Sequence, residues 1–137
     1  MTKTFSLSKS ERVSSQKQID KLFRGGNSKS MSAFPLRMVY MAEERETDWR
    51  CPEAQMMVSV PKRYFKRAVK RNRIKRLVRE AYRLNRHLLT AQLPDDRKTS
   101  LSVCFIWTDD KLRTFADVEE KMQSLLTRLG EKISQSL

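Results

Sequence analysis

The chain has 137 residues, 39% of them hydrophobic, which is enough for one domain with a single modest core but not for two. Its formal net charge of +13 favours a polyanionic partner. Two cysteines, Cys51 and Cys104, are too few for a disulfide framework or a cysteine metal cluster. No segment approaches the ~18 apolar residues of a membrane span, and the first residues lack the apolar core of a signal peptide. We therefore expect a cytoplasmic protein.

The first elements are predicted from caps and apolar runs. Residues 1–13, rich in Ser and Lys, are expected to form a flexible arm before a single domain over 14–137. A short helix is predicted over 14–26, where Ser15 and Gln18 have capping-box spacing and two glycines end the helix. Strands are predicted at 33–41 and 55–60, and the aperiodic segment 42–54 between them is interpreted as a hairpin loop.

The second half of the sequence predicts a helix from about residue 65 to 89, a turn over 93–100, a buried strand over 101–107 and a final helix. Thr114 and Asp117 have capping-box spacing at the start of that last helix. Seven apolar residues form a helical stripe along it: Phe115, Val118, Met122, Leu125, Leu126, Leu129 and Ile133. The order α-β-β-α-β-α predicts an α+β fold, a small α/β sandwich with helices against a small sheet. The strand–helix–strand section is a crossover, and the general rule would make it right-handed.

The positive charge is concentrated in one segment. Residues 62–86 hold twelve Lys or Arg and one acid, Glu80, so they carry +11 and leave 17 basic against 15 acidic residues, or +2, elsewhere. At 100° per residue, one helix face is apolar: Ile74, Leu77, Val78, Ala81, Leu84 and Leu88. The opposite face, flanked by Arg71 and Arg73, is cationic: Asn72, Lys75, Arg76, Arg79, Arg83 and Arg86. Ordinary solvated faces mix acid and base, so this pattern predicts phosphate binding.

Several interpretations remain open from these residues alone. Asn72 could contact a base edge, a 2′-OH or a hydrated metal ion, or be a simple surface amide. A structural RNA-binding protein, such as a ribosomal component, would share the charge and the fold. A DNA-binding transcription factor fits less well, because strands rather than a second helix flank the basic helix. A nuclease site in the protein is not expected, since His87 is the only histidine and the pairs 95–96 and 109–110 suit turns and caps.

The segment "SVPKRYFKRAVKRNRIKRLVREAYR", residues 59–83, resembles the signature of the bacterial ribonuclease P protein component family. Its centre matches the Arg-Asn-Arg motif that the family carries on its crossover helix. Looser agreement comes from "KLFRGG", "MVYM" and "LSVCFIW", so the resemblance covers approximately residues 14–133.

The resemblance implies a small α/β sandwich with an unusual left-handed β-α-β crossover, as in the second domain of a ribosomal protein. It implies a protein subunit of ribonuclease P, the endoribonuclease that matures the 5′ end of tRNA by removing the leader. The catalytic centre is then in the RNA subunit, with Mg²⁺ bound mainly by RNA, and neither catalytic residues nor a metal site are expected in the protein. The implied partners are ribonuclease P RNA, in a 1:1 complex, and precursor tRNA, with no membrane.

The site residues follow from the positions that match the family. The resemblance implies contacts to the catalytic RNA from one set of residues: Lys66, Arg67, Lys70, Arg71, Asn72, Arg73, Lys75, Arg76, Arg79 and Arg83. It also implies a leader cleft between the first helix and the sheet, with Phe23 and Tyr40 stacking on unpaired bases.

Two departures from the family pattern are visible. Ile19 stands where the family often has an aromatic residue, which weakens stacking there. The approach "KRYFKRAV" lacks the usual glycine and has one extra residue, and we expect Tyr64 and Phe65 to seal the start of the basic helix against the core.

Overall fold

The computed structural model describes residues 23, 28–44, 54–91 and 99–135. The predicted arm lies outside these ranges, as does the predicted first helix apart from Phe23. The described elements, in chain order, are β1 (Lys29–Ala33), β2 (Leu36–Glu44), β3 (Ala54–Ser59), α2 (Ala68–Asn85), α3 (His87–Thr90), β4 (Thr99–Trp107) and α4 (Phe115–Gln135).

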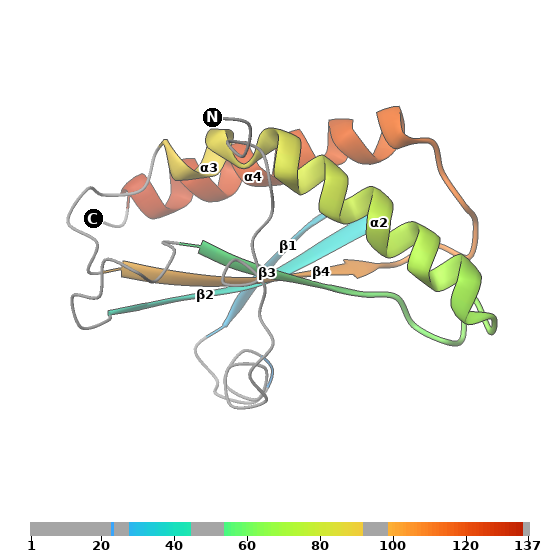
Figure 1. Cartoon of the computed structure of the whole chain (residues 1–137). Coiled ribbons are helices and arrows are strands. Elements are labelled where there is room, and N and C mark those ends of the chain that lie inside the picture. The colour runs from blue at the N-terminus through green and yellow to red at the C-terminus, as the bar shows by residue number, and fades with distance from the viewer. Residues whose placement is uncertain (1–22, 24–27, 45–53, 92–98, 136–137) are drawn as a thin grey trace, which may run out of the picture.

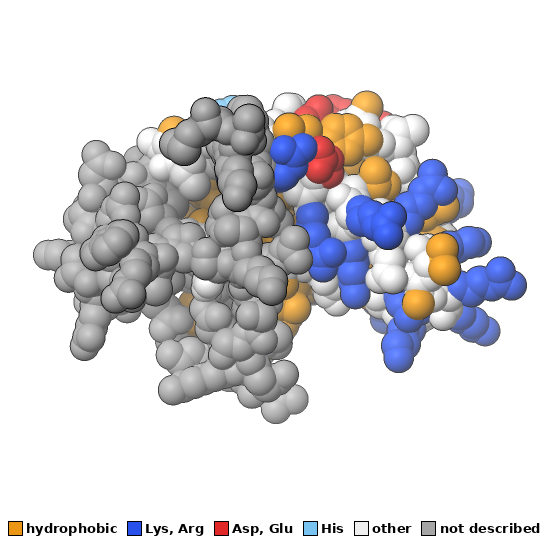
Figure 2. All heavy atoms as spheres, in the orientation of Figure 1, with side chains coloured by type: hydrophobic (Ala, Val, Ile, Leu, Met, Phe, Trp, Pro, Cys, Tyr) orange, Lys and Arg blue, Asp and Glu red, His pale blue; other side chains and the backbone are white. Residues whose placement is uncertain are grey.

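The four strands form one sheet in the order β1-β2-β4-β3, and α2, α3 and α4 cover one of its faces (Figure 1). The pairs β1/β2 and β2/β4 are antiparallel, whereas β3 and β4 are parallel and are connected through α2 and α3. This is the predicted α+β architecture of helices against a small sheet. The handedness of the connection stays a prediction. In the same view, Lys and Arg side chains gather at the end of the molecule where α2 begins (Figure 2).

One prediction about the strands is correct only in part, and another is wrong. The strand predicted over 33–41 is present as β2, but β2 begins at Leu36, because the chain turns at Phe34–Pro35 and Ala33 pairs with Leu36, so that β1 and β2 form a hairpin. Strand β1, with the sequence KSMSA, was not predicted, because an edge strand needs few apolar residues. The segment 42–54 does not connect a hairpin, because β4 lies between β2 and β3. The continuous apolar run of β4 suits a central strand that is buried on both faces.

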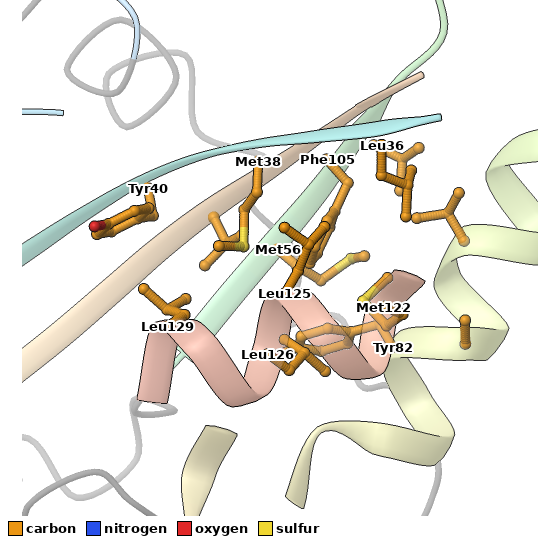
Figure 3. Close-up of a cluster of buried hydrophobic side chains, with 14 of the residues drawn as sticks. Leu36, Met38, Tyr40, Met56, Tyr82, Phe105, Met122, Leu125, Leu126 and Leu129 are labelled. Atoms are coloured by element: carbon orange, nitrogen blue, oxygen red, sulfur yellow. The ribbon is translucent and has the colours of Figure 1, made fainter. Parts of the chain in front are cut away.

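The core lies between the sheet and the helices. Side chains alternate along β3, with Ala54, Met56 and Val58 buried and their neighbours half-buried, which is the period of a sheet with one face on the core. Figure 3 shows side chains of both layers meeting there: Leu36, Met38, Tyr40, Met56, Tyr82, Phe105, Met122, Leu125, Leu126 and Leu129.

The predicted stripe of α4 is confirmed. Its six central members are buried: Val118, Met122, Leu125, Leu126, Leu129 and Ile133. Phe115 is half-buried against the same core. The Asp117 N–H donates to Thr114 Oγ1 at 3.3 Å, as the capping-box spacing predicts.

The basic helix differs from its prediction at both ends and in its rotation. It begins at Ala68 rather than near residue 65 and ends at Asn85, after which α3 forms a separate short turn of helix. Tyr82 and Asn85 join the buried face, while Leu77, Leu84 and Leu88 are only half-buried. The apolar face is therefore rotated toward Tyr82, whose ring centroid lies 5.9 Å from that of Phe105.

Candidate nucleic-acid interface

The rotation of α2 is fixed by its packing and by one buried amide. Asn85, 5% exposed, donates through Nδ2 to the Ala81 carbonyl at 2.8 Å and to Glu119 Oε2 at 2.9 Å. Its Oδ1 accepts from Gln123 Nε2 at 3.0 Å. Every contact of this amide is geometrically specific, so the network ties α2 to α4 in one register. The opposite side of α2 is then held toward solvent.

The Lys and Arg residues of 62–86 form what we call the cationic surface. Seven of them are exposed: Lys62, Arg63, Lys66, Arg67, Lys70, Arg73 and Arg76. The other five are half-buried: Arg71, Lys75, Arg79, Arg83 and Arg86. Figure 2 shows Lys and Arg side chains, in blue, gathered at the end of the molecule where α2 begins. Asn72 is exposed on the same helix. The ten residues predicted to bind RNA thus all lie on α2 or in the loop before it, and none of them is buried.

The loop before α2 is anchored by its two aromatic residues. Phe65 is buried in the core and Tyr64 packs against it half-buried, which confirms that both seal the start of the helix. The Tyr64 N–H donates to the Pro61 carbonyl at 3.2 Å, which closes a turn. Arg63 lies over the Tyr64 ring, with its guanidinium carbon 4.9 Å from the centroid. The extra basic residues of this loop are therefore presented from a fixed base.

Arg71 has a different environment from its neighbours in the Arg-Asn-Arg motif. Its Nη1 donates to the carbonyl oxygens of Phe65 and Lys66, both at 2.8 Å. The guanidinium therefore points back onto the loop, while Asn72 and Arg73 are exposed. The resemblance implied an RNA contact from each of the three residues. The structure divides it into one side chain that holds the loop and two that face outward.

Glu80 and Arg83 form an ion pair on α2. Arg83 donates through Nε to Glu80 Oε2 at 3.1 Å and through Nη2 to Oε1. The hydrogen bond from Arg83 lowers the pKa of Glu80, and the same bond raises the pKa of Arg83. The charge of Arg83 is therefore already partly balanced within the helix.

The two residues predicted to bind a leader are in different environments. Phe23 is 46% exposed, so its ring is open to solvent. Tyr40 is 4% exposed and lies with Leu129 in the core beneath α4 (Figure 3). It shares the inward face of β2 with Leu36 and Met38, since alternate strand residues point to the same side. A ring in this position has no face open to a base, so the predicted leader contact at Tyr40 does not fit this geometry.

Val69 is a residue that the sequence analysis missed. It is 79% exposed in the first turn of α2, among Lys66, Arg67, Lys70 and Arg73. The signal was available, because five residues at 100° each place Val69 about 140° away from Ile74 and off the apolar face. An apolar side chain at this position adds a surface that can contact sugar or base rather than phosphate.

Asp109 is an acidic residue that serves the fold. Asp109 accepts from Arg113 Nε at 2.8 Å and from the Lys111 N–H at 3.3 Å, which is the turn chemistry expected of it. Burial opposes ionisation of Asp109, but the hydrogen bond and charge of Arg113 outweigh it and lower the pKa. Residues 95–96 lie outside the described ranges. Within those ranges no three His, Cys, Asp or Glu side chains gather as metal ligands, and no helix is long and apolar enough to cross a membrane.

Comparison with known proteins gives a consistent result. A sequence model of the family described as Ribonuclease P matches residues 7–130. The ribonuclease P protein component of Porphyromonas gingivalis is 44% identical over 133 residues, which cover 97% of this chain and 93% of that protein. The component of Chlorobaculum tepidum is 37% identical over 95 residues, or 69% of this chain and 60% of that one. The solved ribonuclease P protein of Thermotoga maritima shares the fold, with a TM-score of 0.61 at 21% identity over 86% of this chain and 96% of that one.

Proposed function

Because the chain belongs to the ribonuclease P protein family and is a protein subunit of ribonuclease P, we propose that it binds the enzyme's RNA through the cationic surface and assists removal of the tRNA 5′ leader. The complex would contain one protein per RNA and act in the cytoplasm on precursor tRNA.

The observation that carries this proposal is the concentration of charge on one surface. Residues 62–86 carry +11, and their one acid, Glu80, is paired with Arg83. Seven of the twelve cations are exposed, close enough to repel one another in the free protein. Phosphate groups relieve that repulsion and release their counterions on binding. Arginine also favours a defined geometry, because its planar guanidinium can donate two hydrogen bonds to two oxygens of one phosphate.

The cationic surface also accounts for how a protein without catalytic groups raises the rate. By neutralising phosphates it lowers the Mg²⁺ concentration that RNA folding and substrate docking require. In this proposal Mg²⁺ is bound mainly by the RNA. Among the described side chains, no three His, Cys, Asp or Glu residues are grouped so that they could hold a metal ion. The protein's contribution is then binding and positioning, with the chemistry in the RNA.

Leader recognition is the second part of the proposal, and here it depends on Phe23. An exposed aromatic ring can stack on an unpaired base regardless of its identity. Such a contact is possible with precursor tRNA and impossible with mature tRNA, so it favours substrate over product. Phe23→Ala should therefore weaken binding of leader-bearing substrates only, and an equal effect on leaderless tRNA would exclude the role.

The test is cleavage of a 5′-extended precursor tRNA by a bacterial ribonuclease P RNA at low Mg²⁺, with and without the protein. We expect a large increase in correct 5′ processing with the protein and no cleavage by the protein alone. Tight, salt-sensitive RNA binding without any increase would instead indicate a structural RNA-binding role. Repeating the assay with RNA from Porphyromonas gingivalis, whose protein is 44% identical, guards against a mismatched RNA.

A further inference from the structure

An exposed aromatic residue lies on the described surface outside the cationic surface. Phe34, in the turn between β1 and β2, is 56% exposed, more than Phe23 at 46%. Leu112, in the connection from β4 to α4, is 39% exposed. Neither residue contributes to the core. An exposed aromatic ring at a turn offers apolar surface that a partner can cover with a gain in free energy.

The ring is held in place by the connection that follows β4. Thr108 donates from its N–H and its Oγ1 to the Pro35 carbonyl, at 2.9 and 3.0 Å, and so fixes the turn that carries Phe34. Arg113 places its guanidinium carbon 5.0 Å from the centroid of the Phe34 ring. Asp109, only 7% exposed, in turn holds Arg113 through Nε and Nη2, both at 2.8 Å. The aromatic ring and the planar cation therefore form one preorganised unit.

Sheet topology brings this unit to the same end of the molecule as the cationic surface. Leu36 pairs with Trp107, so the β1–β2 turn lies beside the end of β4. Ser59, the last residue of β3, pairs with Ile106, because β3 and β4 are parallel. The loop into α2 and the loop from β4 into α4 thus leave the sheet at one end (Figure 1). An RNA that covers the start of α2 passes close to the Phe34–Arg113 unit.

We propose that Phe34 and Arg113 form a stacking site for an unpaired nucleotide base of the RNA that occupies the cationic surface. The inference rests on the proposed function and adds a contact of different chemistry to it. Bases stack on aromatic rings and on guanidinium planes, and single-stranded RNA is recognised largely in this way. Since Asp109 already balances the charge of Arg113, the site contributes stacking and little net charge. Its loss should lower affinity without changing the dependence of affinity on salt.

The experiment measures the dissociation constant of the full chain for a bacterial ribonuclease P RNA over a series of salt concentrations. The variants are Phe34→Ala, Phe34→Leu, Phe34→Tyr and, for comparison, Arg76→Glu. We expect Phe34→Ala and Phe34→Leu to bind about tenfold more weakly, with the slope of log K against log salt unchanged. Phe34→Tyr, which keeps the ring, should bind like the unaltered chain. Arg76→Glu should lower both affinity and slope.

Other results would show whether the stacking site or the proposed function is wrong. Unchanged affinity in Phe34→Ala, together with weak binding of Arg76→Glu, would overturn the stacking site and leave the proposed function intact. Full affinity in Phe34→Leu with loss in Phe34→Ala would replace stacking by a simple apolar contact. A second copy of the chain as the occupant would appear as concentration-dependent self-association that Phe34→Ala abolishes in sedimentation. Failure of the unaltered chain to bind RNA or stimulate cleavage would refute the proposed function itself. Thermal melting of each Phe34 variant verifies that it folds.

Discussion

Arg71 shows at the scale of one residue that a cation of the cationic surface can also stabilise the fold. Its hydrogen bonds to the Phe65 and Lys66 carbonyls hold the loop that presents Lys66 and Arg67. Arg71→Ala removes both bonds, so we expect the free energy of unfolding to fall by about 1–2 kcal/mol in urea titrations. Arg73→Ala is the matched control, because Arg73 lies two residues further on in the same motif and is exposed. It should change the free energy of unfolding by less than about 0.5 kcal/mol while weakening RNA binding.

A second readout separates the role of Arg71 from a purely structural one. Hydrogen exchange of the loop amides should speed up in Arg71→Ala but not in Arg73→Ala, because only the first change releases the loop. Arg71→Lys keeps the positive charge but lacks the planar guanidinium, so it should restore little of the protection of the loop amides from hydrogen exchange. If both alanine variants were equally stable and equally poor at binding RNA, Arg71 would be an ordinary phosphate contact.

The reactivity of the Cys104 thiol is set by its burial. It is fully buried on the sheet face opposite the helices, beside Val39 and Met41. Burial raises its pKa to about 12, from an ordinary value of 9.0. At pH 8 its thiolate fraction is then about a thousandfold smaller than that of a free thiol. In a Cys51→Ser chain, we expect iodoacetamide to label Cys104 only after denaturation, as measured by mass spectrometry.

The raised pKa of Cys104 also makes the stability of the fold depend on pH. The folded chain keeps the thiol proton up to a higher pH than the unfolded chain does. The contribution of the neutral thiol to the free energy of unfolding is therefore fully present below about pH 9 and is lost as pH rises toward 12. Rapid labelling of the native Cys51→Ser chain at pH 8 would show that this face of the sheet opens readily.

At the scale of elements, the joint between α2 and α4 depends on Asn85. Its amide satisfies Glu119 and Gln123 across the two helices, so Asn85→Ala leaves the Glu119 carboxylate without that donor. We expect a loss of about 1–3 kcal/mol in the free energy of unfolding by urea. Asn72→Ala, on the exposed side of the same helix, removes the same atoms and should cost less than about 0.5 kcal/mol. Equal losses in the two variants would mean that the network contributes nothing specific.

The strands show why elements are only partly predictable. The final helix was predicted correctly, because its cap and its apolar stripe are local signals. The hairpin at Phe34–Pro35 was missed, because the short strand before it gains its pairing from β2 rather than from its own composition. Likewise, no local pattern indicates that β4, late in the chain, inserts between two earlier strands.

At the scale of the whole molecule, the proposed function predicts that the cationic surface sets how RNA affinity responds to salt. If about six phosphates are contacted, the slope of log K against log salt should be roughly −4 to −5. Arg76→Glu should bind roughly tenfold more weakly and reduce the magnitude of the slope by about one. Lys29→Glu makes the same charge change on β1, an exposed position whose partner in the sheet is Tyr40, far along the strand from the Phe34 turn. It should leave the slope nearly unchanged, as filter binding can measure.

A slope near zero would remove the electrostatic mechanism. Equal slopes in Arg76→Glu and Lys29→Glu would show that RNA responds to total charge, and the cationic surface would lose its special role. A reduced slope in Arg76→Glu alone would support a contact that is localised on α2.

The sequence by itself determined the α+β class, the basic helix with its two faces, the final helix and, through one long motif, the family. These are local properties, because charge, helical period and caps depend on residues a few positions apart. Tertiary structure decided that Tyr40 faces the core, that Arg71 turns back onto its loop, and that Phe34 meets Arg113. Each of these depends on strand order and on contacts between distant segments. A strand's inward face is defined only by what packs against it, and a side chain's partner only by where the fold brings it.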